Sequence, residues 1–137
     1  MVMVELLSES PYSPPSTHGP YRVADYLALP DEPQCELING RLYLSPAPIV
    51  RHQVVVGMLF TILDQQAARS GGKALLSPVD VIIAEHSVVQ PDLVYLCPDR
   101  RHLVRDRVEG VPDLLVEVLS PGSERRDRGT KLRLYAQ

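Results

Sequence analysis

VVQPDLVYL (residues 88–96) and PDLLVEVLS (residues 112–120) are two short runs that are rich in aliphatic and β-branched residues. This composition predicts two β-strands, and each carries one acidic residue among apolar neighbours, Asp92 in the first and Glu117 in the second. A carboxylate is costly to bury in a mostly apolar strand unless it has a partner. Two such acids on neighbouring strands therefore favour a shared partner, and a divalent cation is the simplest one.

Alternation along the second run predicts two unlike faces, because successive side chains of a strand point to opposite sides. One face consists of Asp113, Leu115, Glu117 and Leu119, and the other of Leu114, Val116 and Val118. Asp113 stands at the entrance to the strand, where we expect a structural role.

Two local patterns before the acidic runs are clear. Asn39-Gly40 separates the apolar runs 35–38 and 41–44, and this predicts a β-hairpin with a type I′ turn. Residues 50–69 repeat apolar side chains at the spacing of an amphipathic helix, which Gly71-Gly72 would end. The apolar face expected for this helix consists of Val54, Val55, Met58, Leu59, Ile62 and Leu63.

Weaker patterns complete the chain. They predict a helix over 21–29, a strand over 74–84 that pairs antiparallel with 88–96, and a final helix over 124–137. Residues 1–19 are rich in proline and serine, so we expect a flexible leader, followed by one domain over 20–137. The element order predicts an α+β, sandwich-like fold, with a small mixed sheet flanked by helices.

Composition limits the class of protein. The chain has 137 residues, of which 45% are hydrophobic, so a single globular domain is expected. No apolar run is long enough to cross a membrane, and no signal peptide is visible. The two cysteines lie far apart, which is typical of a cytoplasmic protein with free thiols. The net charge of −3 does not favour a polyanionic partner, although nine of the 14 Lys and Arg residues follow residue 99.

The acids allow one particular chemistry. Hydrolysis of a phosphodiester requires an activated water, compensation of charge on the phosphate and help for the leaving oxygen, and Mg²⁺ can supply most of this. Asp92 and Glu117 are suitable ligands for such an ion. A nearby lysine would orient the water and offset charge. The residue two positions after Glu117 is Leu119, and the next lysine is Lys131, which a helix packed over the sheet could bring to the same place.

Several segments in order resemble one known family. They are ELING (36–40), RHQ (51–53), SPVDV (77–81), QPD (90–92), LVEVLSP (115–121), RDRGTK (126–131) and LYA (134–136). Over residues 20–137 the chain resembles the Uma-type family of restriction-endonuclease-like proteins, within the PD-(D/E)xK nuclease superfamily. The resemblance implies a restriction-endonuclease-like core and a Mg²⁺-dependent (or Mn²⁺-dependent) endonuclease that acts on DNA.

The resemblance also implies roles for individual residues. Asp92, Glu117 and Glu36 would bind the metal, and Lys131 would replace the lysine of the (D/E)xK triplet. His52 would join these four as a catalytic residue, although its role in the family is less certain, as is that of Asp80. A homodimer is expected on general grounds, because cleavage of a duplex needs two sites or two events.

Two departures from the family pattern favour an alternative. Leu119 leaves the triplet without its own lysine, and relatives usually continue into another strand and helix, so a sheet edge could be left unpaired. The alternative is a catalytically inactive protein with the nuclease fold that binds nucleic acid or a protein partner. Simpler roles also stay open for single residues: Asp92 and Glu117 held by arginines or by capping backbone N–H groups, pairing of Glu36 with Arg41, and solvent exposure of Lys131.

Overall fold

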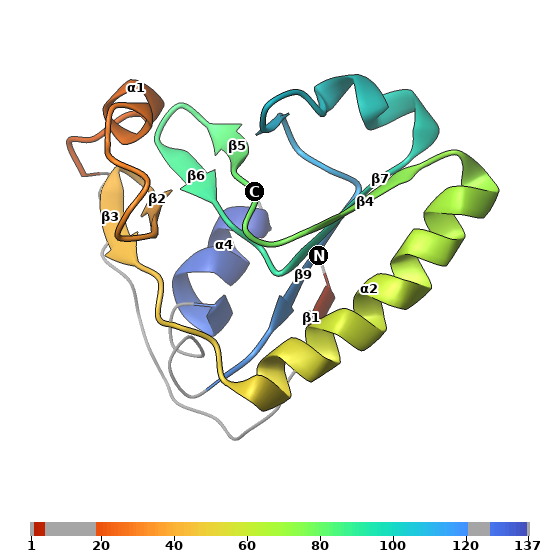
Figure 1. Ribbon diagram of the computed structural model, residues 1–137. Helices are drawn as coiled ribbons and strands as arrows, with labels where there is room; N and C mark the ends of the chain where they lie inside the picture. Colours follow the sequence, from red (N-terminus) through yellow and green to blue (C-terminus); the bar gives the residue numbers. More distant parts are fainter. Residues whose placement is uncertain (1, 5–18, 121–126, 137) are drawn as a thin grey trace.

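The computed structural model describes residues 2–4, 19–120 and 127–136 (Figure 1). In chain order the elements are β1 (Val2–Val4), α1 (Val23–Leu27), β2 (Cys35–Ile38), β3 (Arg41–Leu44), α2 (Val50–Ser70), β4 (Lys73–Leu76), β5 (Val81–Ala84), β6 (Ser87–Val89), β7 (Leu93–Leu96), the 3₁₀-helix η1 (Pro98–Leu103), β8 (Val108–Glu109), β9 (Leu114–Val118), the π-helix η2 (Asp127–Lys131) and α4 (Leu132–Tyr135). The expected α+β class with flanking helices is confirmed.

The strands form two sheets. The first has the order β1-β9-β7-β4 and the second the order β3-β2-β6-β5-β8. The first sheet is mixed, because β1 runs parallel to β9 whereas β7 is antiparallel to both β9 and β4. The long helix α2 runs along this sheet, and α4 lies on the other side of β9 (Figure 1).

The two predicted faces of β9 are confirmed by packing. Val116 and Val118 are buried in a cluster with Val56 of α2. Leu115 lies on the opposite face, in the cluster that contains Leu134 of α4. The alternation of side chains thus places the apolar face of β9 against one helix and the face of Glu117 against the other.

The predicted hairpin is also confirmed. Strands β2 and β3 pair antiparallel, with Ile38 opposite Arg41. The two turn residues, Asn39 and Gly40, have φ angles of 49° and 74°. Two consecutive positive φ angles are what a type I′ turn requires, and asparagine and glycine adopt them at the lowest cost.

The helix over 50–69 is confirmed, but half of its predicted apolar face is wrong. Val54, Met58 and Ile62 are 55%, 65% and 62% exposed. The side that packs on the first sheet carries Val56, with Val55, Leu59, Phe60 and Leu63 around it. Each exposed residue directly precedes one that packs, and one residue is a rotation of about 100°, so this row lies on the flank of the helix and faces solvent.

Each long predicted strand is divided in two. Residues 74–84 form β4 and β5, with Pro78 between them, and residues 88–96 form β6 and β7, with Pro91 between them. The expected antiparallel pairing holds for both halves, since β4 pairs with β7 and β5 with β6, but the halves belong to different sheets. Proline cannot donate a ladder hydrogen bond, which favours an interruption at these positions. Asp92 lies at one of the two breaks.

The two ends of the described chain differ from the prediction. Residues 2–4 form strand β1 on the edge of β9, so this part of the expected leader is paired and covers one edge of the first sheet. Pairing with a strand that is already buried compensates the backbone polar groups of this short segment. The last predicted helix is a π-helix followed by one turn of α-helix, and its expected start at 124–126 lies outside the described residues. In the described part of the chain no helix is both long and apolar enough to cross a membrane.

Candidate active site

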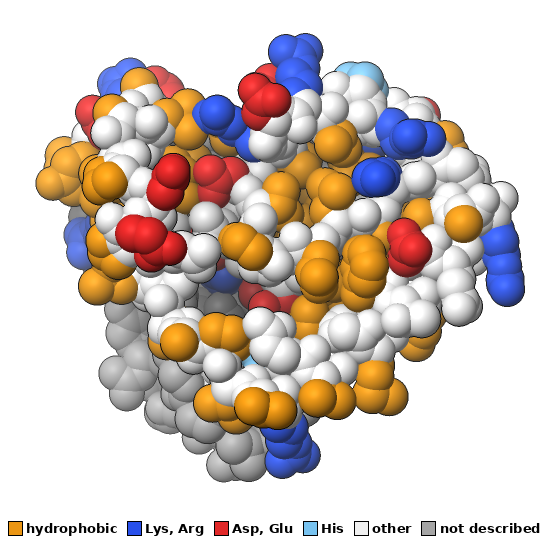
Figure 2. All heavy atoms as spheres, viewed as in Figure 1, with side chains coloured by type: hydrophobic (Ala, Val, Ile, Leu, Met, Phe, Trp, Pro, Cys, Tyr) orange, Lys and Arg blue, Asp and Glu red, His pale blue; other side chains and the backbone are white. Residues whose placement is uncertain are grey.

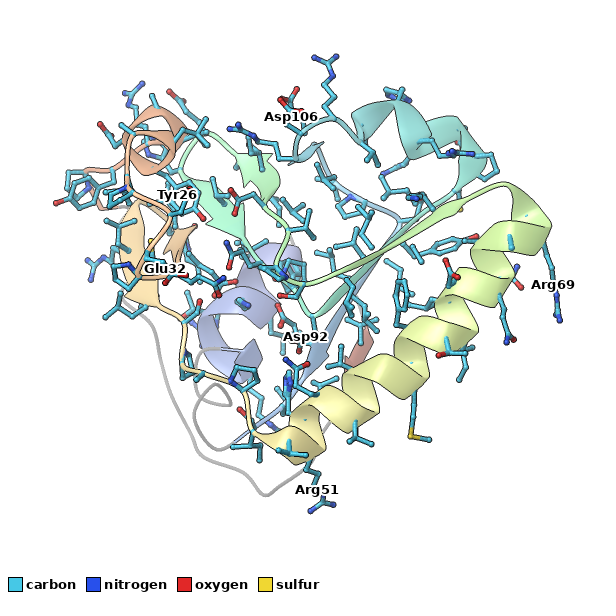
Figure 3. The ribbon with its side chains drawn as sticks, in the orientation of Figure 1. Tyr26, Glu32, Arg51, Arg69, Asp92 and Asp106 are labelled. Atoms are coloured by element: carbon cyan, nitrogen blue, oxygen red, sulfur yellow. The ribbon has the colours of Figure 1, made fainter. Side chains whose placement is uncertain are left out.

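All five predicted site residues line one cavity of about 260 Å³. They come from five separate segments: β2, α2, the break before β7, β9 and η2. Figure 2 shows a hollow in the middle of this face, with acidic side chains at its floor. Figure 3 shows Asp92 inside the molecule, between the strands and the first turns of α2. The residues brought together are Glu36, His52, Asp92, Glu117 and Lys131.

Lys131 links two of the acids. Its Nζ atom lies 2.7 Å from Oε1 of Glu36 and 2.8 Å from Oε1 of Glu117. The three side chains are only 2–4% exposed. A buried charge needs a close partner of opposite sign, and here one ammonium serves two carboxylates. Lys131 is therefore not a solvent-exposed helix lysine, and it reaches Glu117 as expected.

The π-helix η2 explains how the ammonium reaches the sheet. Lys131 is the last residue of η2, directly before α4, and the neighbouring Thr130 is also buried. A π-helical turn inserts an extra residue into a helix and is frequent at functional sites. Leu119, at the position where the triplet would carry its lysine, is 1% exposed. The amine is therefore delivered from a helix on the α4 side of β9.

Two further residues contact the acids and were not predicted. The hydroxyl of Tyr135 donates a hydrogen bond of 2.8 Å to Oε1 of Glu117. The main-chain N–H of Gln90 donates one of 2.7 Å to Oε1 of Glu36. Tyr135 follows Lys131 by four residues, and this spacing places both on one side of a helix, so the sequence contained a usable signal. The contact of Gln90 is made by its backbone, and no side-chain pattern could indicate it.

Asp92 and His52 form a second pair at the same cavity. Oδ2 of Asp92 accepts a hydrogen bond of 2.7 Å from the main-chain N–H of Val118 and lies 3.2 Å from Nε2 of His52. The first bond joins the break before β7 directly to the end of β9. Nδ1 of His52 is buried and has no hydrogen-bond partner in the described structure. Since Nε2 faces a carboxylate, it is the ring nitrogen expected to carry a proton.

The described residues contain no group of three or more His, Cys, Asp or Glu side chains that could hold a metal ion as they stand. The ammonium of Lys131 already contacts Glu36 and Glu117, two of the three predicted ligands. Carboxylate oxygens are nevertheless the donors that Mg²⁺ and Mn²⁺ prefer. The ligand set of Asp92, Glu117 and Glu36 stays a prediction.

The other two acids considered from the sequence lie apart from this cavity. Asp113 accepts a hydrogen bond from the main-chain N–H of Cys97 and pairs with Arg100, in agreement with a structural role. Asp80 lines a second cavity of about 200 Å³, next to Tyr26. Burial, together with a hydrogen bond to Asp80, raises the pKa of the Tyr26 hydroxyl far above its ordinary value.

The fold has a helix on each side of an acid-bearing pair of strands, which agrees with the restriction-endonuclease-like class that the sequence resembles. The chain matches the Uma2 family, described as "Putative restriction endonuclease", over residues 23–137. It therefore belongs to the Uma2 family.

The chain is also similar to individual proteins. An uncharacterized protein of Synechocystis sp. is 32% identical over 104 residues, which are 74% of this chain and 53% of that protein. A crystal structure from Anabaena variabilis, described as a "putative nuclease belonging to DUF820", has a TM-score of 0.69 at 21% identity and supports the fold. The match covers 85% of this chain and 67% of that one. The chain thus spans about half the length of the Synechocystis protein.

Proposed function

We propose that this chain is a divalent-metal-dependent endonuclease that hydrolyses phosphodiester bonds of DNA. The observation that carries the proposal is the convergence of three carboxylates and one ammonium, from four distant segments, on a single cavity. Acids that merely stabilised the fold would not need to share an opening to the surface. The family description points in the same direction.

Asp92 and Glu117 would hold the ion, with Glu36 supporting it, and the bound Mg²⁺ or Mn²⁺ would supply Lewis-acid activation of water and phosphate. The other steps belong to the chain itself. His52 and the N–H of Val118 hold Asp92 in a fixed orientation. Tyr135 does the same for Glu117. The ammonium of Lys131 can donate to the attacking water and offset negative charge in the transition state.

A non-catalytic protein that binds nucleic acid or a protein partner is the second candidate. Two observations favour it: the described residues offer no ready group of three metal-binding side chains, and Leu119 is fully buried where a lysine would stand. A homodimer remains part of the nuclease proposal, since two copies would supply one site for each strand of a duplex.

The test is a nicking assay with supercoiled plasmid and Mg²⁺ or Mn²⁺. Wild type should convert plasmid to the nicked form only with the metal, and Asp92→Ala should lose this activity. Asp113→Ala is the matched control, because Asp113 is an acid beside β9 that does not line the cavity. Binding of DNA without nicking by wild type would support the second candidate and reject the first. Equal nicking by wild type and Asp92→Ala would also reject the nuclease proposal.

A further inference from the structure

A second set of polar side chains lies behind the candidate active site. Oδ1 of Asp80 is 2.9 Å from the hydroxyl of Tyr26 and 2.9 Å from Nε2 of Gln90. The same hydroxyl lies 3.0 Å from the main-chain oxygen of Cys35, beside Glu36 on β2. Tyr26 is buried at the α1 end of the molecule, well away from Asp92 (Figure 3). Asp80 thus joins α1 to the segment before β7, and Tyr26 links this pair to β2.

Gln90 connects this set to the active-site cavity. It lies at the break between β6 and β7, and its side chain and backbone make contacts on different sides. The amide group donates to Asp80, whereas the main-chain N–H donates to Oε1 of Glu36 at 2.7 Å. Both cavities are lined by Gln90. Fixing its side chain limits the rotation of its backbone, and thereby sets the direction of the N–H.

Glu36, like Asp80, has two hydrogen-bond donors at one carboxylate oxygen. Its Oε1 accepts from two donors, the N–H of Gln90 and the ammonium of Lys131, both at 2.7 Å. The direction of the first donor helps to determine where this oxygen lies, and the oxygen in turn positions the ammonium. The sequence of contacts therefore runs from Asp80 through Gln90 and Glu36 to Lys131.

The donor side of this network is stable toward pH. Burial raises the pKa of Tyr26, and the neighbouring Asp80 carboxylate raises it further. The hydroxyl therefore keeps its proton at physiological pH and can donate it to Asp80 or to the main-chain oxygen of Cys35. An acid with two donors within hydrogen-bond distance is well suited to hold its neighbours in place.

We propose that Asp80 is a positioning residue, which acts through Gln90 to hold Glu36 and Lys131 in the geometry of the cavity. The consequence for catalysis rests on the proposed nuclease function, whereas the positioning itself does not. Asp80 touches neither the cavity that holds Asp92 nor the ammonium, so its effect on Lys131 must pass through other residues.

The test uses the chemical reactivity of Lys131. The chain has two lysines, Lys131, which is 3% exposed, and Lys73, which is exposed on β4. The full chain is labelled with an amine-reactive acetylating reagent, and mass spectrometry measures the labelling rate of each lysine. The quantity compared is the rate of Lys131 divided by the rate of Lys73, which serves as internal reference. Asp80→Ala should raise the ratio roughly tenfold, because the orienting hydrogen bonds of Glu36 are weakened.

Two variants separate positioning from general destabilisation. Asp80→Asn keeps an oxygen acceptor and should stay within about twofold of wild type. Ser87→Ala removes a buried hydroxyl of β6 that accepts from the main-chain N–H of Asn39, outside the contacts that join Asp80 to Glu36, and should leave the ratio unchanged. If Asp80→Ala does not fold, Gln90→Ala, which keeps the main-chain N–H, should give the same rise. A flat ratio in the folded variant, an equal rise in Ser87→Ala, or a failure of Asp80→Asn to restore the ratio would overturn the proposal.

The labelling needs neither metal nor DNA. If wild type fails to nick plasmid while the labelling pattern holds, the nuclease proposal falls and the positioning role stands. If wild type nicks plasmid and the ratio does not respond, only the positioning role falls. In an active enzyme, Asp80→Ala should lower kcat, whereas Asp80→Asn should keep kcat close to that of wild type.

Discussion

Replacement of Lys131 by methionine removes the positive charge between two buried carboxylates and leaves a side chain of similar length. The ammonium lies 2.7 Å from Glu36 and 2.8 Å from Glu117, and both acids are almost fully buried. We expect the free energy of unfolding to fall by about 3–5 kcal/mol, the usual loss when one partner of a buried ion pair is removed.

The distances support this magnitude. The two Oε1 atoms contact one nitrogen, so they are no more than about 5.5 Å apart, and two unit charges at that separation repel by roughly 3 kcal/mol at an effective dielectric constant of about 20. A domain of this kind is stable by about 5–15 kcal/mol, so the variant can remain folded. If repulsion causes the loss, Lys131→Met/Glu36→Gln should be more stable than Lys131→Met alone.

Urea unfolding, followed by circular dichroism at pH 7, measures both differences. Arg133→Met is the control, since it removes an exposed positive charge from α4 two residues away and should change stability by less than about 0.5 kcal/mol. A loss below about 1 kcal/mol in Lys131→Met would refute the assignment of Lys131 as the counter-ion of this cavity. So would a double variant that is less stable than the single one.

Three further measurements test individual surroundings in the structure. Tyr135→Phe removes a hydrogen bond to the buried carboxylate of Glu117, and should cost about 1.5–3 kcal/mol in the same urea assay. Gly72→Ala should destabilise the fold by about 1–3 kcal/mol, because the added Cβ would lie 2.7 Å from the main-chain oxygen of Leu96 and from the hydroxyl of Tyr95. Gly57→Ala has open space around it in α2 and should stabilise the fold by up to about 1 kcal/mol. The opposite sign of the two changes is the test. Burial and the charges of Asp80 and Glu36 raise the pKa of Cys35 above its ordinary value of 9.0. In a Cys97→Ser background, alkylation of Cys35 by iodoacetamide should therefore reach half its maximal rate at a pH above 9.0. A midpoint below pH 9.0 would contradict the assignment.

The parts of the fold that were predicted correctly depend on short-range rules. Alternation alone gave both faces of β9, and turn chemistry alone gave the hairpin around Asn39-Gly40. Asp92, Glu117 and Lys131 were singled out from the residues themselves, whereas Glu36 and His52 came from the resemblance to a family. No local rule links Glu36 on β2 to Lys131 on η2. Their convergence is a property of the tertiary fold, and a single sequence does not contain it in readable form.

The errors have a similar origin. The inward face of α2 depends on how the helix is rotated against the sheet, and Val54 and Met58 satisfy the same spacing as the residues that pack. Strand β1 was missed because three residues next to a proline-rich segment gain stability only from pairing with β9. The contact between Gln90 and Glu36 uses a main-chain N–H, which every residue except proline offers.

The charge of the cavity separates the two candidate functions more sharply than the fold does. Its described lining includes three carboxylates and, among lysines and arginines, only Lys131, whose ammonium already contacts two of the three. A phosphodiester is an anion, and such a cavity repels it unless further positive charge is brought in. A divalent cation at Asp92 and Glu117 would reverse the balance, and would make phosphate binding depend on the metal. A protein that binds DNA without metal must therefore do so on another surface, and mutation of Asp92 would then leave its affinity for DNA unchanged.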